Sequence, residues 1–342
     1  ASGVIAASGT LAQIIPPSLV LIILADQLGR SVGDMYAGAI LPGLVLTSMY
    51  VGYVFLRATF SPERAPALPP EARTLRGWKL IGRVLFGMIP PLALIFLVLG
   101  TIFMGIATPT EGGAMGATGA LALALINRRL SWSLLRQAMN STAKLTSFVI
   151  FILVGATVFS LTFRGVNGDL WVEHLLTGIP GGVVGFLILV NVLVFLLAFF
   201  LDFFELAFIV VPLLAPVAEK MGIDLIWFGV LLGVNMQTSF MHPPFGFALF
   251  YLRSVAPFKE YSDKITGKSI APVTTGQIYW GAVPFVVIQC IMVGILIAFP
   301  GLVTSNLEKS TVDPTKVIID IQPTDGASAG EEAPPDFGTP QK

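Results

Sequence analysis

The sequence predicts an all-α, multi-span membrane protein that is built from two inverted repeats, each with a re-entrant helical hairpin. Hydrophobic residues make up 55% of the 342-residue chain and charged residues 12%, whereas soluble domains carry about 25% charged residues. Several apolar stretches reach the length of a spanning helix, which needs about 20 residues. Pro-Pro motifs also interrupt apolar segments at corresponding positions in the two halves, a pattern that points to a binding site in membrane carriers.

The two halves share a pair of motifs in the same order. Each half has a Pro-Pro motif, followed at a distance by an apolar helix that contains Tyr-x-Gly-Ala and then proline. The two pairs are Ser8–Pro17 with Met35–Pro42, and Thr238–Pro244 with Ile278–Pro284. Three residues align without a gap, namely Tyr36, Gly38 and Ala39 with Tyr279, Gly281 and Ala282. This repetition favours hairpins over the alternative that each Pro-Pro motif merely kinks an ordinary helix.

The end of the first repeat is predicted over residues 1–56. A hairpin over Val4–Ala25 places two apolar arms around the polar tip Ser8-Gly9-Thr10, and the spanning helix Met35–Leu56 follows, broken near Pro42. Non-helical backbone at membrane depth is tolerated only where it lines a cavity or is buried in protein. Each predicted hairpin therefore implies a site.

A basic, Pro-rich segment over residues 57–83 is predicted to be a cytoplasmic linker. Cytoplasmic loops carry an excess of Lys and Arg, and the basic loop over residues 127–144 is assigned to the same side for this reason. The second repeat is predicted over residues 84–303. It begins with three spanning segments and one shorter Gly/Ala-rich segment, which has the composition of closely packed helices. In chain order these are Val84–Ala107, the short Gly112–Ile126, Leu145–Phe163 and Gly178–Leu201.

The second repeat ends with the elements that mirror the first half. A short segment with two prolines, Leu206–Ala218, precedes a re-entrant hairpin around residues 225–252 and a broken helix over residues 277–303. The remainder, residues 304–342, is expected to be a disordered acidic tail. The chain starts at Ala1, and we interpret this start as a truncation inside a membrane element. A processed N-terminus is the alternative.

Composition and motifs argue against several classes of protein. The net charge is zero, so the chain does not resemble a nucleic-acid binder. The single cysteine, Cys290, excludes a disulfide scaffold, and the two scattered histidines, His174 and His242, argue against a zinc site. The chain has no nucleophile or metalloprotease motif and no phosphate-binding loop. An enzyme or an ATP-driven pump is therefore disfavoured, and a channel would need a continuous polar pore rather than two closed hairpins.

Four segments together resemble one family. They are Ala7–Ser18, Gly105–Ala114 (which reads GIATPTEGGA), Leu201–Asp202 and Pro243–Gly246. These motifs are similar to those of the large membrane subunit of tripartite ATP-independent periplasmic (TRAP) transporters, and the resemblance covers residues 1–303. His242, together with Asp202–Glu205, resembles the subgroup labelled for mannitol and chloroaromatic compounds, a label that leaves the substrate open.

The resemblance implies an elevator-type ion-transporter fold and a sodium-coupled secondary transporter of small carboxylates in the bacterial inner membrane. Sodium ions are the coupling ions in this family. A periplasmic solute-binding protein delivers the substrate, a small four-helix membrane subunit completes the complex, and the hairpin domain slides against a fixed scaffold. The alternative within the wider superfamily is a sodium- or proton-coupled carboxylate carrier that works without a binding protein.

The hairpin tips and the facing helices supply the candidate sodium ligands. Sodium prefers hydroxyl and carbonyl oxygens, and unwound backbone exposes carbonyls. We expect Ser8–Thr10 to face Gly38 and Ala39, and Asn235–Ser239 to face Gly281–Val283. The candidate residues are Ser8, Gly9, Thr10, Gly38, Ala39, Asn235, Thr238, Ser239, Gly281, Ala282 and Val283. The alternative role for the Gly and Ala residues is close packing between helices.

The candidate substrate residues lie at the Pro-Pro motifs and at an acidic break. They are Pro16, Pro17, Asp202, His242, Pro243, Pro244 and Gly246. A carboxylate within a membrane segment is a functional hypothesis by default, although Asp202 could instead lie in water at the interface, and His242 could be a satisfied polar group. Glu111 is assigned to a helix start, and Asn191 to a polar contact between helices.

Overall fold

The computed structural model describes residues 2–62, 70, 73–243, 246–263, 267, 269–305 and 307. The chain divides into two units, Ala1–Leu307 and Glu308–Lys342, and every described residue belongs to the first. The predicted tail therefore lies outside the described residues from position 308 onward. Part of the predicted linker, residues 63–69, 71 and 72, also lies outside them.

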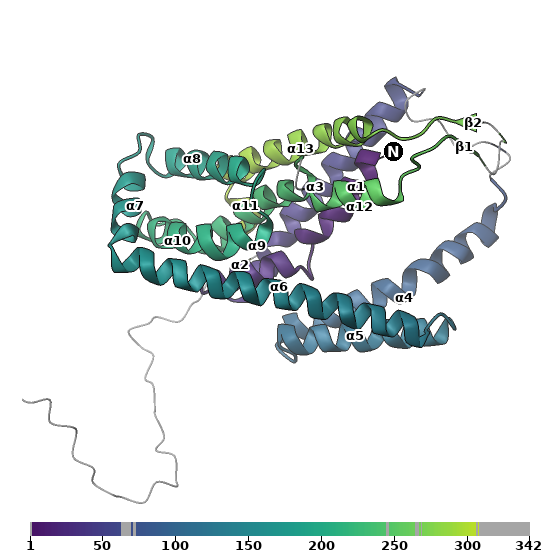
Figure 1. The fold of residues 1–342 in the computed structure, drawn as a ribbon, viewed down its shortest axis with the longest axis horizontal. Coiled ribbons are helices and arrows are strands. Elements are labelled where there is room, and N and C mark those ends of the chain that lie inside the picture. The colour runs from purple at the N-terminus through teal and green to yellow at the C-terminus, as the bar shows by residue number, and fades with distance from the viewer. Residues whose placement is uncertain are drawn as a thin grey trace, which may run out of the picture. The chain divides into compact units, whose positions relative to one another are not determined.

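Helices make up most of the described part of the chain (Figure 1). The helices of the first half are α1 (Ser2–Thr10), the 3₁₀ turn η1 (Leu11–Gln13), α2 (Leu19–Gln27) and α3 (Val32–Phe60). The middle of the chain forms α4 (Gly77–Phe103), α5 (Pro109–Ile126), α6 (Trp132–Gly165), α7 (Gly168–Thr177) and α8 (Gly182–Leu197). The remainder forms α9 (Phe203–Glu205), the π-helical η3 (Leu206–Val210), α10 (Val211–Lys220), α11 (Leu225–Met236), the 3₁₀ turn η4 (Gln237–Met241), α12 (Phe247–Val255), α13 (Thr275–Ala298) and α14 (Gly301–Thr304).

The prediction of a helical membrane protein is confirmed. Four described helices, α3, α4, α6 and α13, are long and apolar enough to cross a membrane. One small departure from an all-α fold is an antiparallel pair of two-residue strands, β1 (Tyr261–Ser262) and β2 (Ser269–Ile270). The strand residues are exposed, so no hydrophobic alternation marks them in the sequence.

Several element boundaries differ from the prediction. Ser8, Gly9 and Thr10 form the last turn of α1 rather than a tip, and the chain leaves helical geometry over residues 14–18. The physical reason is that Pro16 and Pro17 have no N–H to donate, so a helix cannot continue through them. In contrast, α3 continues through Pro42 and α13 through Pro284, so neither helix shows the expected break. Neighbouring helices can stabilise a proline inside a membrane helix.

Side-chain caps set where several helices begin. At α5, the Thr108 hydroxyl accepts a hydrogen bond from the Glu111 N–H, and the Glu111 carboxylate accepts one from the Thr108 N–H. This reciprocal pair satisfies two backbone donors that the first turn leaves free. The predicted role of Glu111 at a helix start is confirmed. Thr274 and Gln277 make the same arrangement at the start of α13.

Helix α11 is the most buried long element of the described chain. All of its residues except Ile226 are buried, and it contacts α2, α3, α8 and α13. Figure 1 shows α4 and α5 running side by side, and few of their residues or those of α6 are buried. Apolar helices with exposed faces suit contact with lipid or with other membrane segments. The core that positions a site therefore gathers around α11.

Candidate functional site

A cavity of about 390 Å³ lies where the two Pro-Pro segments approach each other. Its walls come from both halves of the chain, and six of its residues are aromatic. The lining residues are Gly9, Thr10, Gln13, Leu19, Val20, Leu145, Phe148, Asp202, Phe203, Phe204, Phe240, Phe247, Ala248 and Tyr251. The cavity brings together three residues that the sequence predicted for different roles, namely Gly9, Thr10 and Asp202.

Three helices begin at this cavity. The first residues of α2, α9 and α12, which are Leu19, Phe203 and Phe247, all line it. The first N–H groups of a helix have no intrahelical partner, and they form the positive end of the helix dipole. Ser18 caps α2 and Asp202 caps α9, whereas Gly246 gives α12 no side-chain cap. The Leu249 N–H donates to the Gly246 carbonyl at 2.9 Å, so the N–H groups of Phe247 and Ala248 are the donors of this turn that are left for a ligand among the described contacts.

Asp202 lines the cavity and also starts a helix. Its Oδ1 accepts a hydrogen bond from the Glu205 N–H at 3.0 Å, and Glu205 Oε2 accepts one from the Asp202 N–H at 3.1 Å. Glu205 therefore acts in a reciprocal cap. Asp202 is the only charged side chain among the described lining residues, so it dominates the charge of the cavity.

Polar side chains from α1 and η4 meet beside this cavity. Gln237 Nε2 donates a hydrogen bond to Thr10 Oγ1 at 3.4 Å, and both side chains are buried. The Thr10 hydroxyl in turn donates to the Ala7 carbonyl at 3.0 Å. Sequence reasoning placed Gln237 in the polar tip but did not select it. Its signal was its position between Asn235 and Thr238 in an otherwise apolar segment.

The predicted ligands of the second half divide between two environments. Asn235 Nδ2 donates to the Asn191 carbonyl at 2.7 Å and to Asn191 Oδ1 at 2.8 Å, which confirms the predicted polar contact between helices. Asn235 and Thr238 line a separate cavity of about 470 Å³ with residues of α8 and α13. The Thr238 and Ser239 hydroxyls donate to the carbonyls of Asn235 and Met236, each at 2.7 Å. Because a hydroxyl that donates keeps its lone pairs, both oxygens retain acceptor capacity for a cation.

The chain matches the family model described as "Tripartite ATP-independent periplasmic transporter, DctM component" over residues 1–302. It belongs to this family. The C4-dicarboxylate TRAP transporter large permease protein DctM of Pseudomonas aeruginosa is 30% identical to it over 260 residues, which cover 74% of this chain and 58% of that protein. The sialic acid TRAP transporter large permease protein SiaM of Vibrio cholerae is 27% identical over 259 residues, which cover 75% of this chain and 58% of the relative.

The match confirms the resemblance to TRAP large subunits, and it places the chain among membrane transport proteins rather than enzymes. The sialic acid TRAP transporter permease protein SiaT of Haemophilus influenzae is 24% identical over 303 residues, which cover 88% of this chain and 46% of that protein. The chain thus spans about half of the length of the curated relatives that it matches. The Pro-Pro segments and the cavity between them lie within the matched part of this DctM-family chain.

Gly3 and Gly38 of the first half each pack against residues of the second half. A Cβ on Gly3 of α1 would lie 1.7 Å from the Gly281 carbonyl oxygen, and one on Gly38 would lie 3.1 Å from Ile226 and 2.9 Å from Val303. Helix α1 therefore packs against α13, because two glycines allow these backbones to approach closely. The expected facing of Ser8–Thr10 and Gly38 is wrong, because the atoms nearest to a Cβ on Gly38 belong to Val303 and Ile226.

The other predicted sodium residues are spread over the DctM-family fold. Ala39 and Ala282 are buried, whereas Ser8 and Val283 are exposed. The Ser8 hydroxyl donates to the Ile5 carbonyl at 3.1 Å within α1. Close packing explains Gly38, Gly281 and the two buried alanines without an ion, so their assignment to sodium stays a prediction.

His242, Pro16, Pro17 and Pro243 are not among the residues that line the cavity. The His242 ring is buried, stacks on Phe199 with centroids 4.0 Å apart, and meets Phe195 edge-on at 4.6 Å. Pro17 lines another pocket, beside α4 and α5. Pro16 is buried and Pro243 half-buried, while Pro244 lies outside the described residues. Among the predicted substrate residues that the structure describes, only Asp202 thus lines the cavity.

Gly246 has a structural reason to be glycine. A Cβ there would lie 2.8 Å from the carbonyl oxygens of both His242 and Phe240. The Gly246 N–H donates to the His242 carbonyl at 2.6 Å. This tight turn aims the start of α12 at the cavity.

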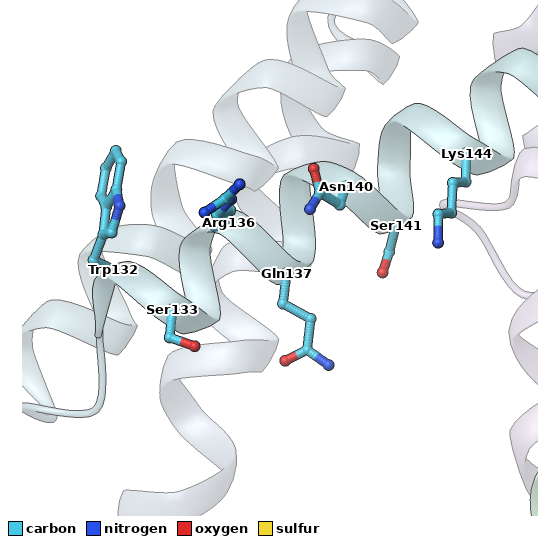
Figure 2. A pocket seen from close by; sticks show the side chains of 7 residues that line it. All are labelled: Trp132, Ser133, Arg136, Gln137, Asn140, Ser141 and Lys144. Carbon is cyan, nitrogen blue, oxygen red and sulfur yellow. The ribbon is translucent and has the colours of Figure 1, made fainter.

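A larger hollow of about 560 Å³ lies along α6. Figure 2 shows that its side chains, from Trp132 to Lys144, all project from that one helix. A single helix face does not enclose a ligand, and none of the predicted site residues lies there. The 390 Å³ cavity at the starts of α2, α9 and α12 remains the candidate site.

Proposed function

We propose that this chain forms the core of a secondary transporter that imports a small organic acid, a carboxylate, across the bacterial inner membrane. A periplasmic solute-binding protein delivers the substrate, a sodium gradient drives import, and a small four-helix membrane subunit completes the complex in the lipid bilayer. The names of the relatives, which include C4-dicarboxylate and sialic acid permeases, support organic acids as the substrate class.

The observation that carries this proposal is the convergence of three helix starts on one cavity. Helix α2 comes from the first half, and α9 and α12 from the second. Helix N-termini attract anions through free N–H groups and the helix dipole, and discontinuous membrane helices bind substrate carboxylates in this way. None of the described lining residues is Lys, Arg or His. Backbone donors at the start of α12 therefore supply the attraction for a carboxylate.

The Asp202 carboxylate gives sodium a physical role. Two negative charges in one cavity repel each other, and a bound cation offsets this repulsion. Thr10 provides a hydroxyl oxygen in the same wall, and sodium favours such ligands. An anionic substrate therefore binds best when sodium is bound, and this dependence couples substrate transport to sodium transport.

The shared wall also supports an elevator movement. Because residues of both hairpin segments line one cavity, the two segments hold a ligand only while they stay together. In the proposal, the two segments are re-entrant hairpins that enter the membrane from opposite sides. They move as one body and carry the ligand past a fixed scaffold.

Replacing sodium with potassium should abolish uptake by the intact complex, because potassium is too large for a site built around sodium. The measurement is uptake into proteoliposomes that contain the full-length permease and its small subunit, with loaded binding protein outside. Accumulation that persists unchanged in potassium would contradict sodium coupling. Sodium-dependent uptake of free substrate without the binding protein would instead favour a carrier of the wider superfamily.

A further inference from the structure

We propose that the start of α6, over residues 132–144, binds the headgroups of anionic phospholipids at the cytoplasmic surface of the membrane. The side chains that line the hollow of about 560 Å³ all project from this helix (Figure 2). Such an open hollow does not enclose a free molecule, but a lipid headgroup needs no enclosure because its acyl chains hold it in the bilayer. This inference does not depend on the transported substrate or on the coupling ion.

Helix α6 is too long to lie wholly within the hydrocarbon of a bilayer. Its 34 residues reach about 51 Å at the rise of an α-helix, whereas the hydrocarbon core is about 30 Å thick. Residues 145–163 form an uncharged, mostly apolar stretch of spanning length, and the charged Arg136 and Lys144 precede it. The start of α6 therefore extends beyond the hydrocarbon, into the layer of headgroups and water.

The start of α6 has two different faces. The residues of the hollow recur every three or four positions from Trp132 to Lys144, so they form one polar stripe along the helix. Between them lie apolar residues, among them Leu134, Ala138 and Met139, which line a separate groove together with residues of α5. A helix with one basic polar face and one apolar face is typical of membrane surfaces. The apolar face is turned to α5, and the polar stripe is left to contact headgroups.

The segment before the apolar stretch carries positive charges that no nearby carboxylate offsets. Its basic residues are Arg128, Arg129, Arg136 and Lys144. All of them are exposed, and within the described part of the chain none of them belongs to an ion pair. No Asp or Glu occurs between Glu111 and Asp169. Lys and Arg near a membrane surface attract anionic lipids, and Arg can donate two parallel hydrogen bonds to a phosphate. The charge of the segment therefore fits an anionic headgroup.

A tryptophan marks the membrane surface at two helix starts. Trp132 is the first residue of α6 and is 76% exposed, and Trp78 is the second residue of α4 and is 86% exposed. Basic residues lie close to each of them, namely Arg129 before Trp132, and Arg76 and Lys79 beside Trp78. Trp is enriched at the membrane–water interface, and an excess of Lys and Arg indicates the cytoplasmic side. Both helix starts therefore indicate the cytoplasmic leaflet.

The stripe can contact more than one headgroup. Arg136 and Lys144 lie about 12 Å apart along the helix axis, and Asn140 projects between them in the same hollow. The hydroxyl and amide groups of Ser133, Gln137 and Asn140 can bond to phosphate and glycerol oxygens. Lipids held in this way would fix the depth at which α6 enters the bilayer.

The test is photo-crosslinking of the purified full-length permease with its small subunit, in vesicles of phosphatidylcholine and phosphatidylglycerol. The probe is a trace of phosphatidylglycerol with a diazirine on its headgroup, and labelled chymotryptic peptides are identified by mass spectrometry. We expect labelling within residues 132–144. Combining Arg136→Gln with Lys144→Gln should reduce this labelling about fivefold or more, because two charges that attract the headgroups are lost. Both side chains are exposed, so the variant should melt like the wild type.

The matched control is Arg164→Gln, which removes an exposed cation from the last turn of the same helix. It should keep the wild-type labelling of residues 132–144. Excess unlabelled phosphatidylglycerol should suppress the labelling, whereas inorganic phosphate should not. Equal labelling by a phosphatidylcholine probe, wild-type labelling of the double variant, or competition by inorganic phosphate would each overturn the lipid site. Labelling that appears only after the small subunit is removed would assign this face to that subunit instead.

Discussion

Uptake should be lost when Ala248, in the first turn of α12, is replaced by aspartate. Ala248 lines the cavity and follows the uncapped start of the helix. A carboxylate there would take up the free N–H groups and repel an anionic substrate. Two like charges about 4 Å apart cost about 4 kcal/mol near a protein surface, so substrate affinity should fall by roughly 100-fold or more. The measurement is sodium-driven uptake into proteoliposomes.

Ala248→Asn is the matched control for this prediction. Asparagine has nearly the volume of aspartate but no charge, so it adds the same bulk to the cavity. It should retain much more uptake than Ala248→Asp, and both variants should melt at similar temperatures. Equal uptake by the two variants would mean that the start of α12 does not hold an anion.

A second large effect is expected from Gly3→Val, through the packing of α1 on α13. A Cβ at Gly3 would lie 1.7 Å from the Gly281 carbonyl oxygen and 2.4 Å from the carbonyl carbon. The obstacle is backbone and cannot rotate away, so the helices must separate. Overpacking costs about 1–3 kcal/mol and occasionally more. The movement would also displace Gly9 and Thr10 at the other end of α1, so both melting temperature and uptake should fall.

Gly9→Ala provides the comparison on the same helix. A Cβ at Gly9 meets nothing within 4 Å, so this change should leave the melting temperature unchanged. A Gly3→Val complex with wild-type melting temperature and uptake would show that the α1–α13 contact is not needed. Valine at Gly38 or Gly281 gives a less specific test of sodium binding, because both positions are closely packed.

Local features of this fold could be predicted from the sequence. Apolar length located α3, α4 and α13, and the Thr108–Glu111 spacing located the start of α5. Asn191 was found because a lone amide in an apolar helix needs a partner, which is Asn235. These features depend on residues close in the chain or on the cost of burying a polar group, so the sequence alone carries the signal.

Long-range pairing could not be predicted in the same way. The repeat suggested that each hairpin faces the helix of its own half, but Gly3 of the first half meets Gly281 of the second. A glycine in an apolar helix does not indicate which helix approaches it. The convergence of α2, α9 and α12 on one cavity has no local signature either, because it depends on how distant turns are packed. For the same reason, Gln237 was recognised only from its burial beside Thr10.

Protection of a cysteine at Gly9 by substrate tests most directly whether the 390 Å³ cavity at the starts of α2, α9 and α12 holds the transported anion. Gly9 is exposed in the cavity wall, and a side chain there meets nothing within 4 Å. In a Cys290→Ala background, labelling of Gly9→Cys by a charged thiol reagent is followed in sodium, with and without the carboxylate that the binding protein delivers. Substrate should slow labelling at Gly9 but not at Ser133→Cys on α6, which lies outside the cavity. Equal labelling rates at Gly9 with and without substrate would contradict the account.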